Sequence, residues 1–146
     1  MKSVSCFRSG IVFACICWPT ITAAPRDNVQ LNQGSVRFAE QLIETGHFVA
    51  DKKGGWRDHR PSSDEENQFI RTHGIAEYAK WHLGIDERHS ENTKAGYKFP
   101  FGDFKNVHRS ALIAISSRAR QYGYAQIENA AIELQRRLEQ KAKPAR

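Results

Sequence analysis

Three histidines and two aspartates are the first residues to consider for chemistry, because imidazole and carboxylate groups are common ligands of transition metals. His82, His89 and His108 could bind a metal ion together with Asp86 or Asp103. No two of these histidines have the i,i+4 spacing that places both ligands on one face of a helix. The sequence therefore predicts no metal site and no cofactor, and His82 and His108 are interpreted first as packed or hydrogen-bonded side chains.

Asp103, His108 and Ser110 have the residue types of a Ser/His/Asp triad. All three fall within two turns of one predicted helix, and no Gly-x-Ser-x-Gly turn exposes the serine. No catalytic residue is therefore predicted. The alternative is a metal-dependent or hydrolytic enzyme that uses a cluster of His82, Asp103, His108 and Arg109.

Arg118 points to a different chemistry, the binding of an anion. Helical periodicity places it on the same face as Ala111 and Ile115, and an arginine on an apolar face needs an acceptor. Glu77 or Asp86 could supply a carboxylate, or Arg118 could anchor an anionic ligand. The candidate ligand-binding residues are Trp81, His82, Tyr97, Phe101, Asp103, His108, Arg109 and Arg118.

The net charge of +6 belongs to the C-terminal part of the chain. Residues 1–103 carry 13 Lys and Arg against 13 Asp and Glu, whereas residues 104–146 carry 9 against 3. A solvated basic face is the simpler interpretation, and an anionic partner such as nucleic acid or an acidic protein is the alternative. The candidate phosphate contacts are Lys105, Arg109, Arg120, Arg136 and Arg137. The chain has no recognised base-reading motif, so any nucleic-acid binding should be weak and independent of sequence.

The cysteines limit the chemistry of the folded part. Cys6, Cys15 and Cys17 all precede Trp18, and no thiol follows. We expect residues 26–146 to form a single helical domain. Because this domain has no cysteine, it can contain neither a disulfide framework, nor a cysteine-bound zinc, nor a cysteine nucleophile.

Residues 1–25 form an N-terminal extension with some features of a signal peptide. Lys2 and Arg8 precede a short apolar run at 11–18, which is much shorter than the roughly 20 residues needed to span a bilayer. Pro25 directly follows Ala24 at the best cleavage point. We therefore expect a dispensable extension and a cytoplasmic protein without a transmembrane segment, with export through a signal-like segment as the alternative.

Apolar periodicity and capping residues predict an all-α fold with four or five helices. The first runs from a cap at Ser35 to Gly46, and the second follows a capping box formed by Ser63 and Glu66. The others cover residues 75–83, about 104–122 and about 125–141, with residues 86–96 as a polar loop. Residues 97–103 should be extended and packed on the helices. The expected core is Phe38, Leu42, Phe69, Tyr78, Trp81, Leu83, Phe99, Val107, Ala111, Ile115 and Leu134.

Three motifs carry a resemblance: EYAKWHLGI at 77–85, YKFPFGDF at 97–104 and VHR at 107–109. As a set they resemble a family of small bacterial proteins to which no activity is assigned, over roughly residues 35–140. The resemblance implies a bacterial source and a cytoplasmic domain, and it implies no catalytic residue. The best hypothesis at this point is a small non-enzymatic binding protein.

Overall fold

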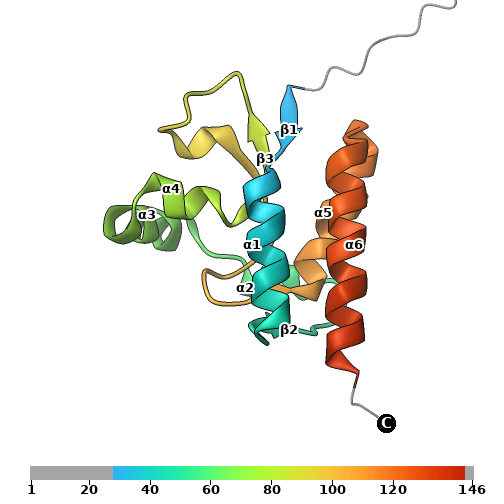
Figure 1. The fold of residues 1–146 in the computed structure, drawn as a ribbon. Helices are drawn as coiled ribbons and strands as arrows, with labels where there is room; N and C mark the ends of the chain where they lie inside the picture. Colours follow the sequence, from blue (N-terminus) through green and yellow to red (C-terminus); the bar gives the residue numbers. More distant parts are fainter. Residues whose placement is uncertain (1–27, 144–146) are drawn as a thin grey trace, which may run out of the picture.

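The computed structural model describes residues 28–143 and shows a mixed α/β protein (Figure 1). The prediction of an all-α fold is wrong, because five strands form two sheets. The larger sheet is antiparallel in the order β1–β3–β4, and the smaller one pairs β2 with β5 in parallel. The strands are β1 (Val29–Leu31), β2 (Phe48–Val49), β3 (His82–Asp86), β4 (Tyr97–Pro100) and β5 (Val107–His108). The expected N-terminal extension and the three cysteines lie outside the described residues.

Six α-helices and one 3-10 turn (Lys94–Gly96) complete the described part of the chain. The helices are α1 (Gln33–Glu44), α2 (Trp56–His59), α3 (Ser63–His73), α4 (Ile75–Ala79), α5 (Arg109–Tyr122) and α6 (Ala125–Ala142). No helix within residues 28–143 is both long and apolar enough to cross a membrane.

Three helix ends have capping residues of the kinds that are common in proteins. Asn32 caps α1 by accepting a hydrogen bond from the Ser35 backbone N–H at 3.2 Å. The capping box of α3 is formed by Ser62 and Glu65, one residue earlier than predicted. Gly123 joins α5 to α6 in the left-handed conformation, with φ of 79°, which favours glycine.

Two predicted helices include residues that form other structure. Residues 75–83 were expected to be one helix, but α4 ends at Ala79 and β3 begins at His82, so the expected polar loop also starts later. The helix expected from residue 104 begins at Arg109 instead. The carboxylate of Asp103 does not cap a helix; it accepts hydrogen bonds from the backbone N–H groups of Lys105 and Asn106 in a turn.

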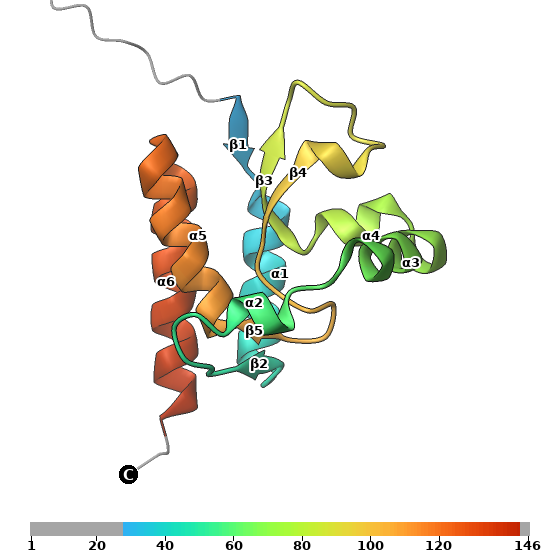
Figure 2. The same cartoon turned by 180° about the vertical axis from the view of Figure 1, so that it is seen from behind.

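The hydrophobic core lies where α1, α5 and α6 meet the antiparallel sheet (Figures 1 and 2). Helices α5 and α6 pack side by side, and α1 packs against α6. Seven of the expected core residues are buried: Tyr78, Trp81, Leu83, Val107, Ala111, Ile115 and Leu134. The other four, Phe38, Leu42, Phe69 and Phe99, are half-buried against this core.

Candidate functional site

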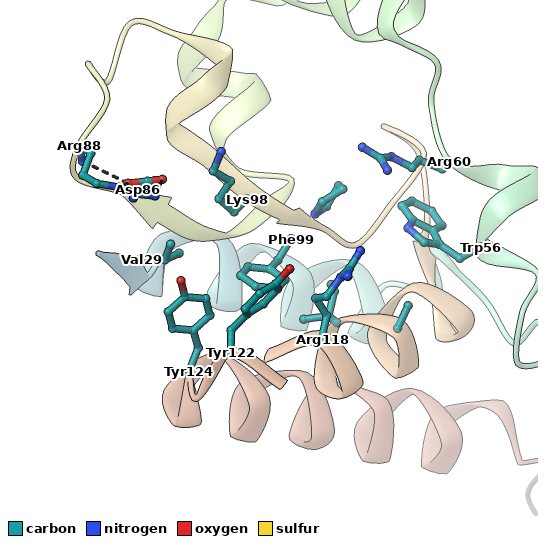
Figure 3. A pocket seen from close by; sticks show the side chains of 13 residues that line it. Val29, Trp56, Arg60, Asp86, Arg88, Lys98, Phe99, Arg118, Tyr122 and Tyr124 are labelled. Atoms are coloured by element: carbon teal, nitrogen blue, oxygen red, sulfur yellow. Dashed lines mark hydrogen bonds and ion pairs between the residues drawn. The ribbon is translucent and has the colours of Figure 1, made fainter. Parts of the chain in front are cut away.

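A pocket of about 490 Å³ lies between the antiparallel sheet and α5 (Figure 3). Its apolar walls are mostly rings, and its polar groups are mostly cations. The apolar lining consists of Val29, Trp56, Phe99, Pro100, Ala114, Ile115, Tyr122 and Tyr124. The charged lining consists of Arg60, Asp86, Arg88, Lys98 and Arg118. Apolar walls with a few charged groups are typical of sites for small organic molecules.

The acid of this pocket is already neutralised. The side chain of Asp86 is fully buried, and the guanidinium of Arg88 donates to both of its oxygens at 2.8 and 2.7 Å. These hydrogen bonds hold the pKa of Asp86 well below its usual range, and the backbone N–H of Arg88 adds a further bond at 3.2 Å. Burial opposes this shift without cancelling it. Asp86 therefore leaves no charge to balance the other cations.

Arg60, which directly follows α2, Lys98 of β4 and Arg118 of α5 face the same pocket (Figure 3). Among residues 28–143, none of the three forms an ion pair with an acidic side chain. The guanidinium of Arg118 lies 5.8 Å from the centre of the Tyr122 ring, within range of a cation–π contact. Arg118 is exposed and lines this cavity, and neither Glu77 nor Asp86 forms an ion pair with it. That Arg118 holds an anion stays a prediction.

The ring wall depends on a glycine in the central strand. A Cβ on Gly84 would lie 2.8 Å from Cγ1 of Val29 and 2.9 Å from Cδ2 of Phe99, so any larger residue would displace both. Phe99 itself has φ of 63°, a left-handed conformation that costs a non-glycine residue about 1–3 kcal/mol. Its ring meets that of Tyr124 edge-on at 5.9 Å. Strained residues of this kind are often found at ligand sites. Phe99 lines the pocket, whereas Phe104, with φ of 66°, does not.

Several predicted site residues lie away from this pocket. The rings of Trp81 and Phe101 are in the core, 5.7 Å apart. His82 is buried beside Tyr78 and Tyr97. Its Nδ1 lies 2.9 Å from the backbone carbonyl oxygen of Tyr78, which can only accept, so Nδ1 carries the hydrogen. Burial lowers the pKa of His82 to about 4.

His108 belongs to a second polar cluster at the N-terminus of α5. Its Nδ1 lies 3.0 Å from Oδ2 of Asp51, and its Nε2 lies 3.3 Å from Oδ2 of Asp103. Asp51 also accepts hydrogen bonds from the backbone N–H and the hydroxyl of Ser110, in the first turn of the helix. Burial raises the pKa of Asp51, but the hydrogen bonds from Ser110 and His108 outweigh it and leave that pKa below its usual value.

The structure therefore separates the predicted cluster of His82, Asp103, His108 and Arg109. Asp103 and His108 are adjacent, whereas His82 lies in the separate group with Tyr78 and Tyr97. Arg109 pairs with Glu139 at 2.7 Å, and its Nη1 lies 3.4 Å from the Asp51 carbonyl oxygen. In this arrangement Ser110 donates its hydroxyl hydrogen to a carboxylate and not to a histidine, so it does not have the geometry of a nucleophile.

Most cations of the predicted basic face already have acidic partners. Arg109 pairs with Glu139, Arg120 with Glu128, Arg136 with Glu133, and Arg137 with both Glu133 and Glu40. Lys105 is exposed, and no ion pair joins it to another residue of the 28–143 segment. Such pairs reduce the charge that this face offers to phosphate groups.

Comparisons of the chain with protein-family models, with curated proteins and with solved structures found no match. The pocket residues that the sequence did not single out are Trp56, Arg60, Arg88, Lys98, Tyr122 and Tyr124. These residues lie far apart in the sequence, so no local pattern connects them. Among the pocket residues, only Arg118 could be chosen as a candidate from its periodic position.

Proposed function

We propose that this protein binds a small organic anion with a flat, apolar body and does not catalyse a reaction on it. The observation that supports this proposal is the gathering of Arg60, Lys98 and Arg118 on one ring-walled pocket without acidic partners in the described chain. The anionic group would meet the cations, and the apolar body would lie against Phe99 and Tyr122.

The charges favour an anion over a neutral or cationic ligand. Three cations without counter-charges raise the positive potential of a concave surface, which concentrates anions there. An arginine can also donate two parallel hydrogen bonds to a carboxylate or a phosphate, and this geometry adds selectivity to charge. The volume of about 490 Å³ is in the range of sites for small molecules.

Nucleic acid remains a second candidate for the anionic partner, because Lys105 is exposed and a nucleotide combines a phosphate with a flat base. The ion pairs along α6 argue against a long phosphate track on the basic face. A single nucleotide could still place its base on the ring wall of the pocket.

We also keep the cytoplasmic location as a proposal, and sequencing the N-terminus of the protein from fractionated cells would test it.

Isothermal titration with two matched ligands tests the proposed function. We expect 2-naphthoate, a flat carboxylate, to bind at least about tenfold more tightly than 2-naphthamide, its uncharged counterpart, since one charge-assisted contact supplies such a difference. Arg118→Gln should remove most of that preference. Arg71→Gln is the matched control, because Arg71 is exposed on α3 and does not line the pocket.

Equal binding of the carboxylate and the amide would reject the anion site. A preference for the carboxylate that survives in Arg118→Gln would place the anion elsewhere. A parallel titration with a single-stranded oligonucleotide separates the two candidate partners, because nucleic-acid binding through several phosphates weakens steeply with salt.

A further inference from the structure

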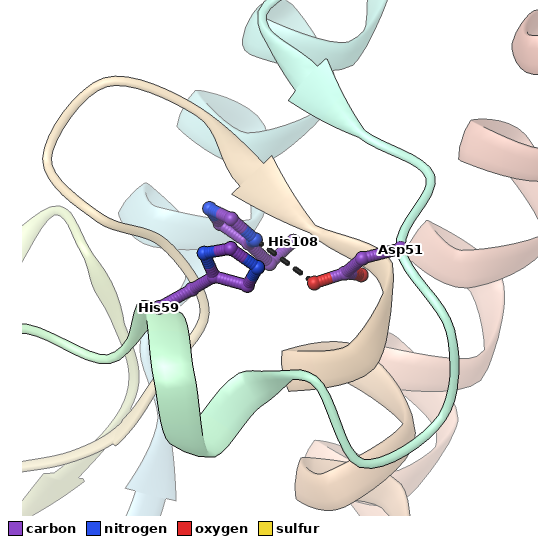
Figure 4. Close-up of side chains that lie close together, drawn as sticks. All are labelled: Asp51, His59 and His108. Carbon is purple, nitrogen blue, oxygen red and sulfur yellow. Dashed lines mark hydrogen bonds and ion pairs between the residues drawn. The ribbon is translucent and has the colours of Figure 1, made fainter.

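We propose that Asp51, His59 and His108 form a binding site for a divalent transition-metal ion, with Zn²⁺ as the ion that fits the ligands best. One ligand atom from each of the three residues lies within 4.8 Å of the other two. Figure 4 shows a ring nitrogen of His59 and Nδ1 of His108 facing the Asp51 carboxylate. Two imidazoles and one carboxylate are a common ligand set of zinc and iron sites with an open position.

The spacing is close to what a metal ion requires. Metal–ligand bonds of about 2.0–2.2 Å place the ligand atoms of a tetrahedral zinc site about 3.3–3.6 Å apart. Nδ1 of His108 and Oδ2 of Asp51 are already 3.0 Å apart. His59 is an exposed residue of α2, a helix of one turn, and its ring stacks on that of His108 with the ring centres 4.9 Å apart. The His59 side chain would therefore have to turn for one of its nitrogens to point at an ion held by the other two residues.

The hydrogen bonding of a neutral His108 is not satisfied by the residues around it. The side chain is 2% exposed, and its Nε2 is buried and makes no hydrogen bond within residues 28–143, although Oδ2 of Asp103 lies at 3.3 Å. A neutral imidazole carries one hydrogen. Whichever nitrogen holds it, the other presents a lone pair to a carboxylate oxygen, of Asp51 or of Asp103.

A metal ion between His108 and Asp51 resolves this conflict. Nδ1 and the Asp51 oxygen would then share the cation, and the hydrogen on Nε2 would point to Asp103. A histidine that binds a metal with one nitrogen and donates from the other to a carboxylate is a recurrent arrangement. Asp103 would then be a positioning residue for His108.

The charges of the cluster also call for a cation. Within the described residues, neither Asp51 nor Asp103 forms an ion pair with a lysine or an arginine. Two carboxylates thus share a partly buried site with two imidazoles, and a divalent ion would balance them. The competing explanation is an imidazolium of His108 held between the two aspartates, which needs neither a metal nor His59.

Titration of the metal-stripped full chain with Zn²⁺ distinguishes these two explanations. We expect binding of one equivalent, and His59→Ala should weaken it at least tenfold. His59 is exposed, so this variant should keep its thermal midpoint. His73→Ala is the matched control, since His73 is also exposed and lies on α3.

Asp103→Asn tests the positioning role. Asparagine keeps the oxygen that accepts from Lys105 and Asn106, but it replaces the acceptor that faces Nε2 with an amide donor. We expect a 10–100-fold lower Zn²⁺ affinity, as is typical for partners of metal-binding histidines.

The visible absorption of bound Co²⁺ should change in His59→Ala and not in His73→Ala. Absence of saturable binding, or binding that His59→Ala leaves intact, would overturn the metal site and leave the imidazolium explanation.

Discussion

The guanidinium of Arg88 and the carboxylate of Asp86 are joined by two parallel hydrogen bonds at the end of the central strand. Asp86 is fully buried, whereas the Arg88 side chain is 61% exposed. An arginine at the surface thus provides the hydrogen bonds that a buried carboxylate needs. Because this pair removes the only acidic group that lines the described pocket, the remaining cations have no counter-charge there.

Arg88→Gln should destabilise the protein, because it removes two charge-assisted hydrogen bonds from a buried carboxylate. The folded-state pKa of Asp86 lies below its unfolded value, so this stabilisation is present above the unfolded pKa of about 3.9 and is lost as pH falls. Urea unfolding should therefore show a larger difference between Arg88→Gln and wild type at pH 7 than at pH 3. A difference that does not change with pH would contradict the role of Asp86.

Ser62→Ala should cost about 1 kcal/mol of the free energy of unfolding, a typical value for the loss of an N-cap. The hydroxyl of Ser62 accepts from the Glu65 backbone N–H at 3.3 Å. Ser63 lies one residue inside α3 and provides no cap, so Ser63→Ala should have little effect. Chemical denaturation of the two variants compares the observed capping box with the one predicted from the sequence, and the opposite ranking would restore the predicted one.

The sequence predicted well those helices that show a clear pattern within their own residues. α1, α3 and α6 have regular apolar stripes, and their observed ends lie within three residues of the predicted ones. The cap of α1 is Asn32, three residues before the predicted Ser35. The strands could not be predicted in this way. They contain two to five residues, which is too short for an alternating pattern, and β2 finds its partner 59 residues away in β5.

The candidate sites were only partly predictable for the same reason. His108 and Asp103 are close in the chain and were chosen together, but Asp51 and His59 reach His108 only through tertiary structure. The helix predicted to begin at about residue 104 was also wrong there, because Asp103 belongs to a turn that brings its Oδ2 to 3.3 Å from Nε2 of His108. Arg118 could be chosen as a candidate from the sequence, because its charge interrupts the apolar periodicity of a predicted helix face.

His82 should make stability fall as the solution becomes acidic. Its pKa is about 4 in the folded protein and about 6.5 in the unfolded chain, so the unfolded chain binds the proton first. The free energy of unfolding should drop by about 3 kcal/mol between pH 6.5 and pH 4 from this group alone. His82→Asn can keep the hydrogen bond to the Tyr78 carbonyl without titrating.

Unfolding measured from pH 7 to pH 4 should therefore show a weaker pH dependence in His82→Asn than in wild type. The same replacement at exposed His73 serves as the control and should retain the wild-type profile. Identical profiles for wild type and His82→Asn would show that His82 does not titrate as a buried group.

Phe101→Ala should cost about 3–5 kcal/mol, since the ring is completely buried against Trp81 and its removal leaves a cavity. Ile132→Ala on α6 is the comparison, because Ile132 is 43% exposed and should contribute little. Thermal unfolding of both variants measures the difference. An unchanged midpoint in Phe101→Ala would mean that this ring lies on a surface site and not in the core.

The position of a bound anion tests the central claim most directly. Two-dimensional NMR of the ¹⁵N-labelled protein during titration with 2-naphthoate reports which backbone amides sense the ligand. The anion pocket predicts that the largest, saturable shifts occur at Lys98, Phe99, Tyr122 and Tyr124. Shifts confined to the basic residues of α6, or no saturable shifts at all, would contradict it.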